Sequence, residues 1–132
     1  MQIKPKLPAA TESIRESARR MAEKTKLPYD FLEREARIAV QSVNIDRARN
    51  AKEKAFAAGD LDAYRAWMIK EARFTAGLTQ QELADLMGTG QPAIARLEDP
   101  KYDGQSLSTI MKVAKALGMR FQPPMILQDS NT

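Results

Sequence analysis

The sequence predicts an all-α protein, and three features of the chain support this. Residues 29–58 contain no Gly or Pro and are rich in Ala, Arg, Lys and Glu, which favour helix. Elsewhere the apolar residues recur at the three- and four-residue spacing of a helix. From residue 59 onward, residues that begin and end helices recur at helix-length intervals. One short strand is expected near Met119–Gln122, where Pro123-Pro124 would end it or keep it at a sheet edge.

Residues 1–59 are expected to form a helical N-terminal extension made of an arm and two helices. Residues 1–10 contain Pro5 and Pro8 and are expected to be an extended, loosely ordered arm. Thr11 is a suitable N-cap for a first helix that ends near Lys26, because Leu27-Pro28 interrupts the helical pattern. Four apolar residues recur along it at helical spacing: Ile14, Ala18, Met21 and Ala22.

The second helix of the extension is predicted from Tyr29 to about Ala58. It carries an apolar stripe of five residues: Leu32, Ala36, Ala39, Val40 and Val43. Beyond Val43 the stripe thins to alanines, so the later half of this helix is expected to be more exposed.

Gly59-Asp60 marks the start of a second unit, residues 60–122, because Gly suits the position after a helix and Asp caps the next helix. Four helices are expected there: residues 61–75, one beginning at Thr79, one beginning near Gln91, and residues 106–117. Four residues are expected to lie on one face of the first of these helices: Leu61, Tyr64, Met68 and Ala72. Residues 123–132 remain as a C-terminal tail.

The best-defined local pattern runs from Leu78 to Glu98. Thr79 and Glu82 form a capping box, in which the side chain of each residue accepts a hydrogen bond from the other's backbone amide. Gly88 lies where a tight turn between two helices needs a positive φ, and Pro92 suits the first turn of the helix that follows. The core is expected to consist of apolar residues at helical spacing: Leu83, Met87, Ile94, Leu97, Leu107, Ile110, Met111, Ala114 and Leu117.

The composition excludes several kinds of site. The 132 residues include no Cys and no His, which excludes thiol nucleophiles, cysteine metal sites and histidine proton transfer. We expect no enzyme activity, no cofactor and no metal, because no spacing of carboxylates or lysines indicates a catalytic pocket. No secretory signal and no run of about 20 apolar residues is present, so no membrane association is expected and the chain is predicted to be cytoplasmic. The net charge of +4 favours an anionic partner.

The string LTQQELADLMGTGQPAIARLE at residues 78–98, followed by SLSTIMKVAKALG at residues 106–118, resembles the lambda-repressor-like (Cro/cI, or Xre) family of DNA-binding domains. Five residues fall in register with the family pattern: Gln80, Ala84, Gly88, Ile94 and Leu97. The resemblance covers residues 61–118 and implies a helix-turn-helix domain. In such domains the third helix, here Gln91 to about Glu98, lies in the major groove of double-stranded DNA.

Carried over by position, the resemblance implies base contacts from this third helix. Gln91, at its start, is expected to make a bidentate contact to adenine. Arg96 is expected to reach a guanine edge or a phosphate; the alternative is an ion pair with Glu98 or Asp99. Pro92 and Ala95 can offer only apolar contact, for example to a thymine methyl group.

The resemblance also implies contacts to the DNA backbone around that helix. Gln80 is expected to hold a phosphate and to brace Gln91; the alternative for both is a solvated glutamine. The remaining expected contacts lie in the turn and in the loop before the fourth helix: Thr89, Gly90, Lys101, Tyr102 and Ser106. A loop-packing role is the alternative for Tyr102. Residues 1–60, with 13 basic and 9 acidic side chains, either add phosphate contacts or form a solvated surface.

The function expected from these features is sequence-specific regulation of transcription, by a homodimeric repressor bound to operator DNA. The dimer contact is expected in the N-terminal helices or in residues Met119–Leu127. The alternative is an antitoxin similar to the HigA type, which binds a toxin protein and represses its own operon. The GTGQPAIARLE string and the extra helical segment resemble such proteins, whereas a basic N-terminal segment is a poor electrostatic match for the basic toxins of that class.

Overall fold

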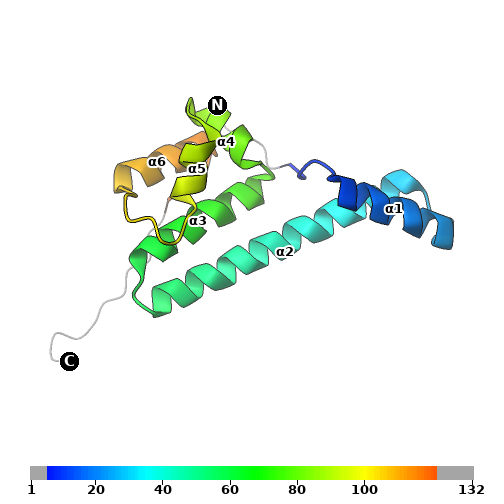
Figure 1. Cartoon of the computed structure of the whole chain (residues 1–132), viewed down its shortest axis with the longest axis horizontal. Coiled ribbons are helices and arrows are strands. Elements are labelled where there is room, and N and C mark those ends of the chain that lie inside the picture. The colour runs from blue at the N-terminus through cyan, green and yellow to red at the C-terminus, as the bar shows by residue number, and fades with distance from the viewer. Residues whose placement is uncertain (1–5, 122–132) are drawn as a thin grey trace.

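The computed structural model describes residues 6–121, which form six helices and no strand (Figure 1). They are α1 (Glu12–Thr25), α2 (Tyr29–Ala57), α3 (Leu61–Ala76), α4 (Gln80–Met87), α5 (Gln91–Leu97) and α6 (Leu107–Ala116). The all-α prediction is therefore confirmed over this part of the chain. Within residues 6–121 no helix has the length and apolarity needed to cross a membrane.

The strand expected near Met119–Gln122 is wrong for residues 119–121, which have no regular structure. A strand needs a neighbour with which to share backbone hydrogen bonds, and the elements around this segment are helices. Gln122 lies outside the described residues.

Short polar side chains define where four of the helices begin. Thr11, Asp60, Thr79 and Ser106 each accept a hydrogen bond from the backbone amide three residues later, at 3.0–3.3 Å. These caps satisfy amides that have no partner inside their own helix. The helix starts therefore follow from the local sequence.

α2 runs antiparallel to α3 and packs along its length (Figure 1). The contacts of α2 with α3 include a small buried residue, two ion pairs and the Phe56–Tyr64 ring pair. Ala48 is fully buried there, and Arg49 and Lys52 both pair with Glu71 of α3, at 2.7 and 2.6 Å. A small residue at such a crossing lets two helix backbones approach closely.

The apolar stripe predicted for α2 is only partly buried. Leu32 and Ala36 are half-buried, whereas Ala39, Val40 and Val43 are exposed. These last three residues are exposed because α2 packs on α3 through another face, which carries Ala48, Arg49 and Lys52.

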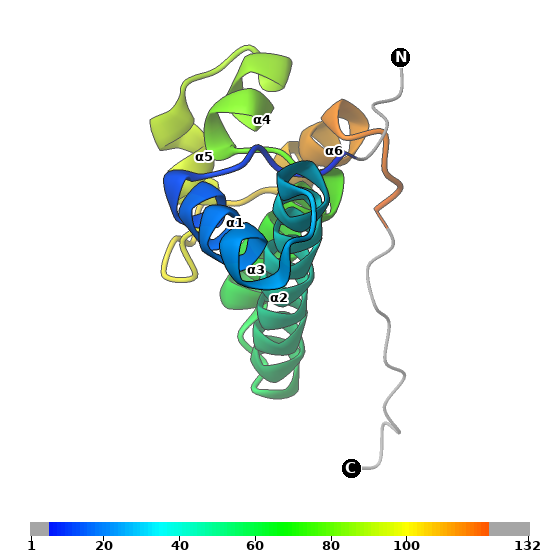
Figure 2. The same cartoon turned by 90° about the vertical axis from the view of Figure 1, so that its right-hand side faces the viewer.

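α1 packs against the first half of α2, and this pair of helices projects from the rest of the molecule (Figures 1 and 2). Ile14 and Ala18 form the buried face of α1. At the free end of the pair, Met21, Leu27 and Phe31 are each about half exposed. We call these three residues the hairpin tip.

The core lies between α3, α4, α5 and α6. It contains the following buried residues: Ile69, Ala76, Leu78, Leu83, Ala84, Ile94, Ile110, Val113 and Leu117. Leu107 and Met111 were expected in it but are 62% and 51% exposed. α6 buries the neighbouring face, which carries Ile110, Val113 and Leu117, so its first apolar pair remains at the surface.

The four residues predicted to share one face of α3 are only partly buried. Leu61 is 51% exposed, and Tyr64, Met68 and Ala72 are only half-buried. The buried residues lie on the adjacent face, where α2 covers the helix: Ala63, Ala66, Ile69, Arg73 and Ala76.

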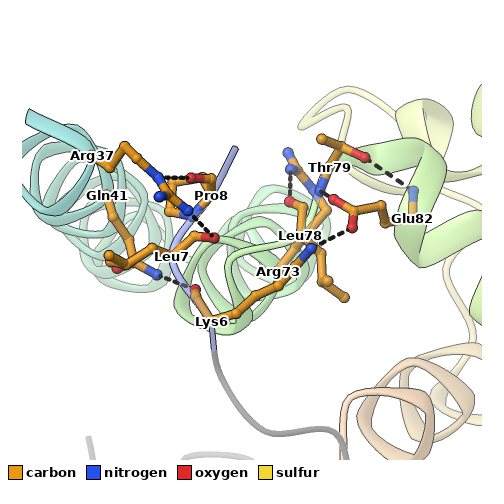
Figure 3. Close-up of polar contacts among 9 residues, drawn as sticks. All are labelled: Lys6, Leu7, Pro8, Arg37, Gln41, Arg73, Leu78, Thr79 and Glu82. Carbon is orange, nitrogen blue, oxygen red and sulfur yellow. Dashed lines mark hydrogen bonds and ion pairs between the residues drawn. The ribbon is translucent and has the colours of Figure 1, made fainter. Parts of the chain in front are cut away.

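The arm was expected to be loosely ordered, and this prediction is wrong for residues 6–10. They are bound between α2 and the end of α3 (Figure 3). The Lys6 amide donates to the Ala76 carbonyl at 3.2 Å, and Gln41 Nε2 donates to the Lys6 carbonyl at 3.2 Å. Arg37 Nε donates to the Pro8 carbonyl at 2.7 Å. Side chains of α2 therefore hold the arm by its backbone, which a hydrophobic pattern does not reveal.

The arm also reaches the first turn of α4. Gly77 ends α3 with a φ of 75°, and a Cβ at this position would lie 1.7 Å from the Lys6 carbonyl oxygen. Only glycine allows the arm this approach. Lys6 Nζ pairs with Glu82 Oε2 at 2.6 Å, and this hydrogen bond, with a second from the Thr79 amide, lowers the pKa of Glu82.

Candidate nucleic-acid interface

Residues 79–97 form two short helices joined by a tight turn, α4 and α5. The Thr79 hydroxyl accepts from the Glu82 amide at 3.1 Å and the Glu82 carboxylate accepts from the Thr79 amide at 3.0 Å, which confirms the capping box. Gly88 ends α4 with a φ of 67°, as the turn was expected to need. Ile94 is fully buried and anchors α5 on the core, so the opposite side of this helix faces solvent.

A chain of hydrogen bonds links the first residue of α5 to the core. Gln91 Nε2 donates to Gln80 Oε1 at 2.7 Å, and Gln80 Nε2 donates to Glu98 Oε1 at 3.2 Å. Glu98 in turn accepts from Nε and Nη2 of Arg73, at 2.6 and 2.8 Å. The expected bracing of Gln91 by Gln80 is therefore present, and the alternative of two freely solvated glutamines does not hold.

The Arg73–Glu98 ion pair is the most deeply buried polar contact of this region. The two side chains are 8% and 2% exposed, and the guanidinium meets the carboxylate with two parallel hydrogen bonds. Arg73 Nη1 also donates to the Leu78 carbonyl at 2.8 Å. One guanidinium thus ties α3 to the turn before α4 and to the residue that follows α5.

The outward side of α5 carries the residues expected to meet bases. Pro92 and Arg96 are exposed, and Gln91 and Ala95 are half-buried. They lie side by side on one short helix, as a reading surface requires.

Arg96 does not form the ion pair that was the alternative to DNA contact. Glu98 is bound to Arg73, and Asp99 Oδ1 accepts from the Lys101 amide at 2.9 Å. Within residues 6–121 Arg96 has no ion-pair partner. Its guanidinium is therefore available to an external anion.

The residues expected near the DNA backbone surround α5. Four of them are exposed: Thr89, Gly90, Lys101 and Ser106. Tyr102 is half-buried, and its ring lies against Gly104, where a Cβ would come within 2.1 Å of the hydroxyl. Packing in the loop is thus part of the role of Tyr102. The Ser106 hydroxyl already accepts from the Thr109 amide, so this amide is not free to bind a phosphate.

Sequence reasoning missed Arg73 and did not identify the structural role of Glu98. One pattern pointed to Arg73, which follows Ile69 by four residues and precedes Ala76 by three, and therefore lies on the buried face of α3. A charge in that register needs a buried partner. The partner lies 25 residues further along the chain, and nothing in the local sequence identifies it.

Comparison with known proteins agrees with this geometry. The model of a family described as helix-turn-helix matches residues 69–122, which is less than half of the chain. No curated protein and no solved structure matches the chain. The matched segment contains the second half of α3 and all of α4, α5 and α6. Residues 69–122 are therefore similar to a helix-turn-helix family, and their all-α arrangement is consistent with a lambda-repressor-like fold.

Proposed function

We propose that the protein is a sequence-specific, double-stranded DNA-binding transcription regulator that acts as a dimeric repressor. The observation that carries the proposal is the state of Gln91. This residue begins α5, lies beside exposed Pro92 and Arg96, and is held through Gln80 by the buried Arg73–Glu98 pair. A side chain fixed before binding loses little conformational freedom when it meets a base.

The hydrogen-bonding groups that remain on Gln91 suit adenine. The Nε2 group has two N–H bonds, of which one is given to Gln80 Oε1. Its second N–H is available to donate to N7 of adenine, while Gln91 Oε1 accepts from the adenine 6-amino group. Gln80 therefore fixes the rotation of the Gln91 amide. It leaves the second Nε2 N–H and the Oε1 of Gln91 free to bind a base.

A dimer is proposed because one α5 helix offers few groups that can distinguish bases. Of its outward residues, Pro92 and Ala95 can make only apolar contacts. Two copies on neighbouring half-sites would double the number of contacts and the sequence length that is read. For the dimer contact, the exposed Val40 and Val43 of α2 support the N-terminal helices as the surface. In the other segment, Met119–Leu127, residues 122–127 lie outside the described residues.

The test is selection of bound sequences from a pool of random duplexes of about 30 base pairs, or three helical turns. The wild type should enrich one motif with two related halves. Gln91→Ala should reduce the preference for the selected motif over its adenine-substituted form by roughly 5- to 150-fold, the value of one bidentate base contact. Gln81→Ala is the matched control, because Gln81 is an exposed glutamine of α4 that binds Asp85. Failure to enrich any motif would refute the proposal.

A second candidate function, an antitoxin similar to the HigA type, is supported by the hairpin tip. Met21, Leu27 and Phe31 leave apolar surface at the far end of a projecting pair of helices, which suits contact with another protein. The test is co-expression with the product of the reading frame beside the gene. A stable complex that Phe31→Asp disrupts, with unchanged DNA binding, would favour this function; wild-type chain that purifies alone would exclude it.

A further inference from the structure

A hollow of about 260 Å³ lies beside α5, on the side of α6. Five polar residues and four apolar residues line it: Thr89, Arg96, Tyr102, Thr109 and Lys112, with Met87, Ala93, Ile94 and Leu97. It brings together the turn before α5, one flank of α5, the loop after it and one flank of α6. Neither Thr109 nor Lys112 is among the site residues predicted from the sequence.

The hollow is positively charged. Its two ionisable cations, Arg96 and Lys112, come from different helices, and no carboxylate lines it. Neither cation has an ion-pair partner in the described part of the chain, and residues 104–121 contain no Asp or Glu. The nearest acids along the chain from Arg96 are occupied, because Glu98 binds Arg73 and Asp99 accepts from the Lys101 amide.

The walls of the hollow suit an anion that carries several oxygens. The side chains of Thr89, Tyr102 and Thr109 add hydroxyl groups to the two cations. The floor contains Ile94, which is fully buried, and Leu97. Charges that meet over an apolar floor are screened less than charges surrounded by water.

The position of the hollow indicates which kind of anion would bind there. Arg96 belongs both to the hollow and to the outward side of α5, next to Ala95 and one turn from Pro92. When a short helix enters the major groove, the charged groups along its flank meet the phosphates at the edge of that groove. A phosphodiester is therefore the ligand that this side of α5 would reach first.

We infer that Arg96 of α5 and Lys112 of α6 hold one DNA phosphate between them in this hollow, so that α6 anchors the reading helix on the backbone. This inference rests on the proposed function and adds a residue, Lys112, to it. The contact would carry no sequence information. It would add affinity for any duplex and leave the reading of bases to Gln91.

The test compares Lys112→Ala with Lys115→Ala. Both lysines are exposed on α6 and both changes remove one positive charge, but Lys115 does not line the hollow. The dissociation constant is measured by fluorescence anisotropy over a range of salt concentrations. Two duplexes of equal length are used as probes, the motif obtained by selection and a scrambled version of it.

Loss of one phosphate contact should make the slope of log association constant against log salt concentration less steep by about 0.9. A tenfold dilution of salt would then raise the affinity of the variant by about eightfold less than it raises that of the wild type. We expect this for Lys112→Ala on both duplexes, with the ratio of the two affinities unchanged. Lys115→Ala should change the slope by less than a third as much. Circular dichroism melting of both variants should match the wild type, since neither residue is buried.

Equal slopes for Lys112→Ala and the wild type, or equal changes for both lysine variants, would overturn the inference. If Gln91→Ala still reduced sequence preference in that case, the proposed function would stand without the inference. A wild type that binds both duplexes equally would instead refute the sequence-specific function. The phosphate contact would then still be tested by the salt slope of Lys112→Ala. A wild type that binds neither duplex would refute both.

Discussion

Replacing Glu98 with Gln tests whether the buried ion pair organises the reading helix. The change keeps the shape of the Glu98 side chain but leaves Arg73, whose side chain is 8% exposed, without its counter-charge. Removal of one partner from a buried pair typically destabilises a protein by about 3–5 kcal/mol, because the remaining charge is not solvated. This is a large share of the roughly 5–15 kcal/mol that stabilises an ordinary domain.

The free energy of unfolding is best measured by urea titration followed by circular dichroism. For a chain of this size the expected loss corresponds to a fall in melting temperature of roughly 10–20 °C. Glu12→Gln is the control, because Glu12 also pairs with arginines but its side chain is 65% exposed. We expect no measurable change in the control, since exposed ion pairs contribute little.

A second variant separates loss of charge from loss of packing. Arg73→Met combined with Glu98→Leu removes both charges and should recover most of the stability lost in Glu98→Gln, because no unpaired ion remains. It should not recover sequence preference, since Gln80 no longer has the carboxylate that accepts its amide. If Glu98→Gln proved as stable as Glu12→Gln, or if the double variant read the selected motif as well as the wild type, the reasoning would be refuted.

Two further predictions concern the arm and the α2–α3 contact. Gly59→Ala and Gly77→Ala both place a side chain at positive φ, at 74° and 75°, but only a Cβ at Gly77 meets the Lys6 carbonyl. In urea titration we expect Gly77→Ala to lose roughly 1 kcal/mol more free energy of unfolding than Gly59→Ala, which is the value of the hydrogen bond between Lys6 and Ala76. Gly77→Ala should also become cleavable by protease within residues 6–10. Equal losses in the two variants would contradict the binding of the arm. The pKa of Glu71 is lowered from its ordinary value of 4.5: burial alone would raise it, but hydrogen bonds from Lys52 and Arg49 outweigh burial. The stabilisation is therefore present above pH 4.5 and lost as the pH falls through the lower folded value, so the wild type should lose stability on acidification more steeply than Glu71→Gln; parallel curves would contradict this.

The parts of the fold that could be predicted depend on residues close together in sequence. The capping box joins Thr79 to Glu82, and the turn of Gly88 depends on one backbone angle. Helix limits also follow from such contacts, because a cap satisfies an amide three residues away. The positions of Gln80 and Gln91 could be predicted for the same reason, because each is the first residue of a short helix.

The parts that could not be predicted depend on distant residues or on the choice between two faces of a helix. Lys6 and Glu82 are separated by 76 residues, and each belongs to an ordinary local pattern. Leu107 and Met111 have the spacing of core residues, yet α6 buries Ile110, Val113 and Leu117 instead. Periodicity predicts that a helix has an apolar face but does not determine which neighbour covers it.

The projection of α1 and the start of α2 separates two exposed surfaces of the molecule. α1 begins beside the arm, and its 14 residues carry the hairpin tip roughly 20 Å further from the α4–α5 pair, at a rise of 1.5 Å per residue. The hairpin tip and the outward side of α5 therefore lie on separate parts of the molecule, connected through α2 and α3.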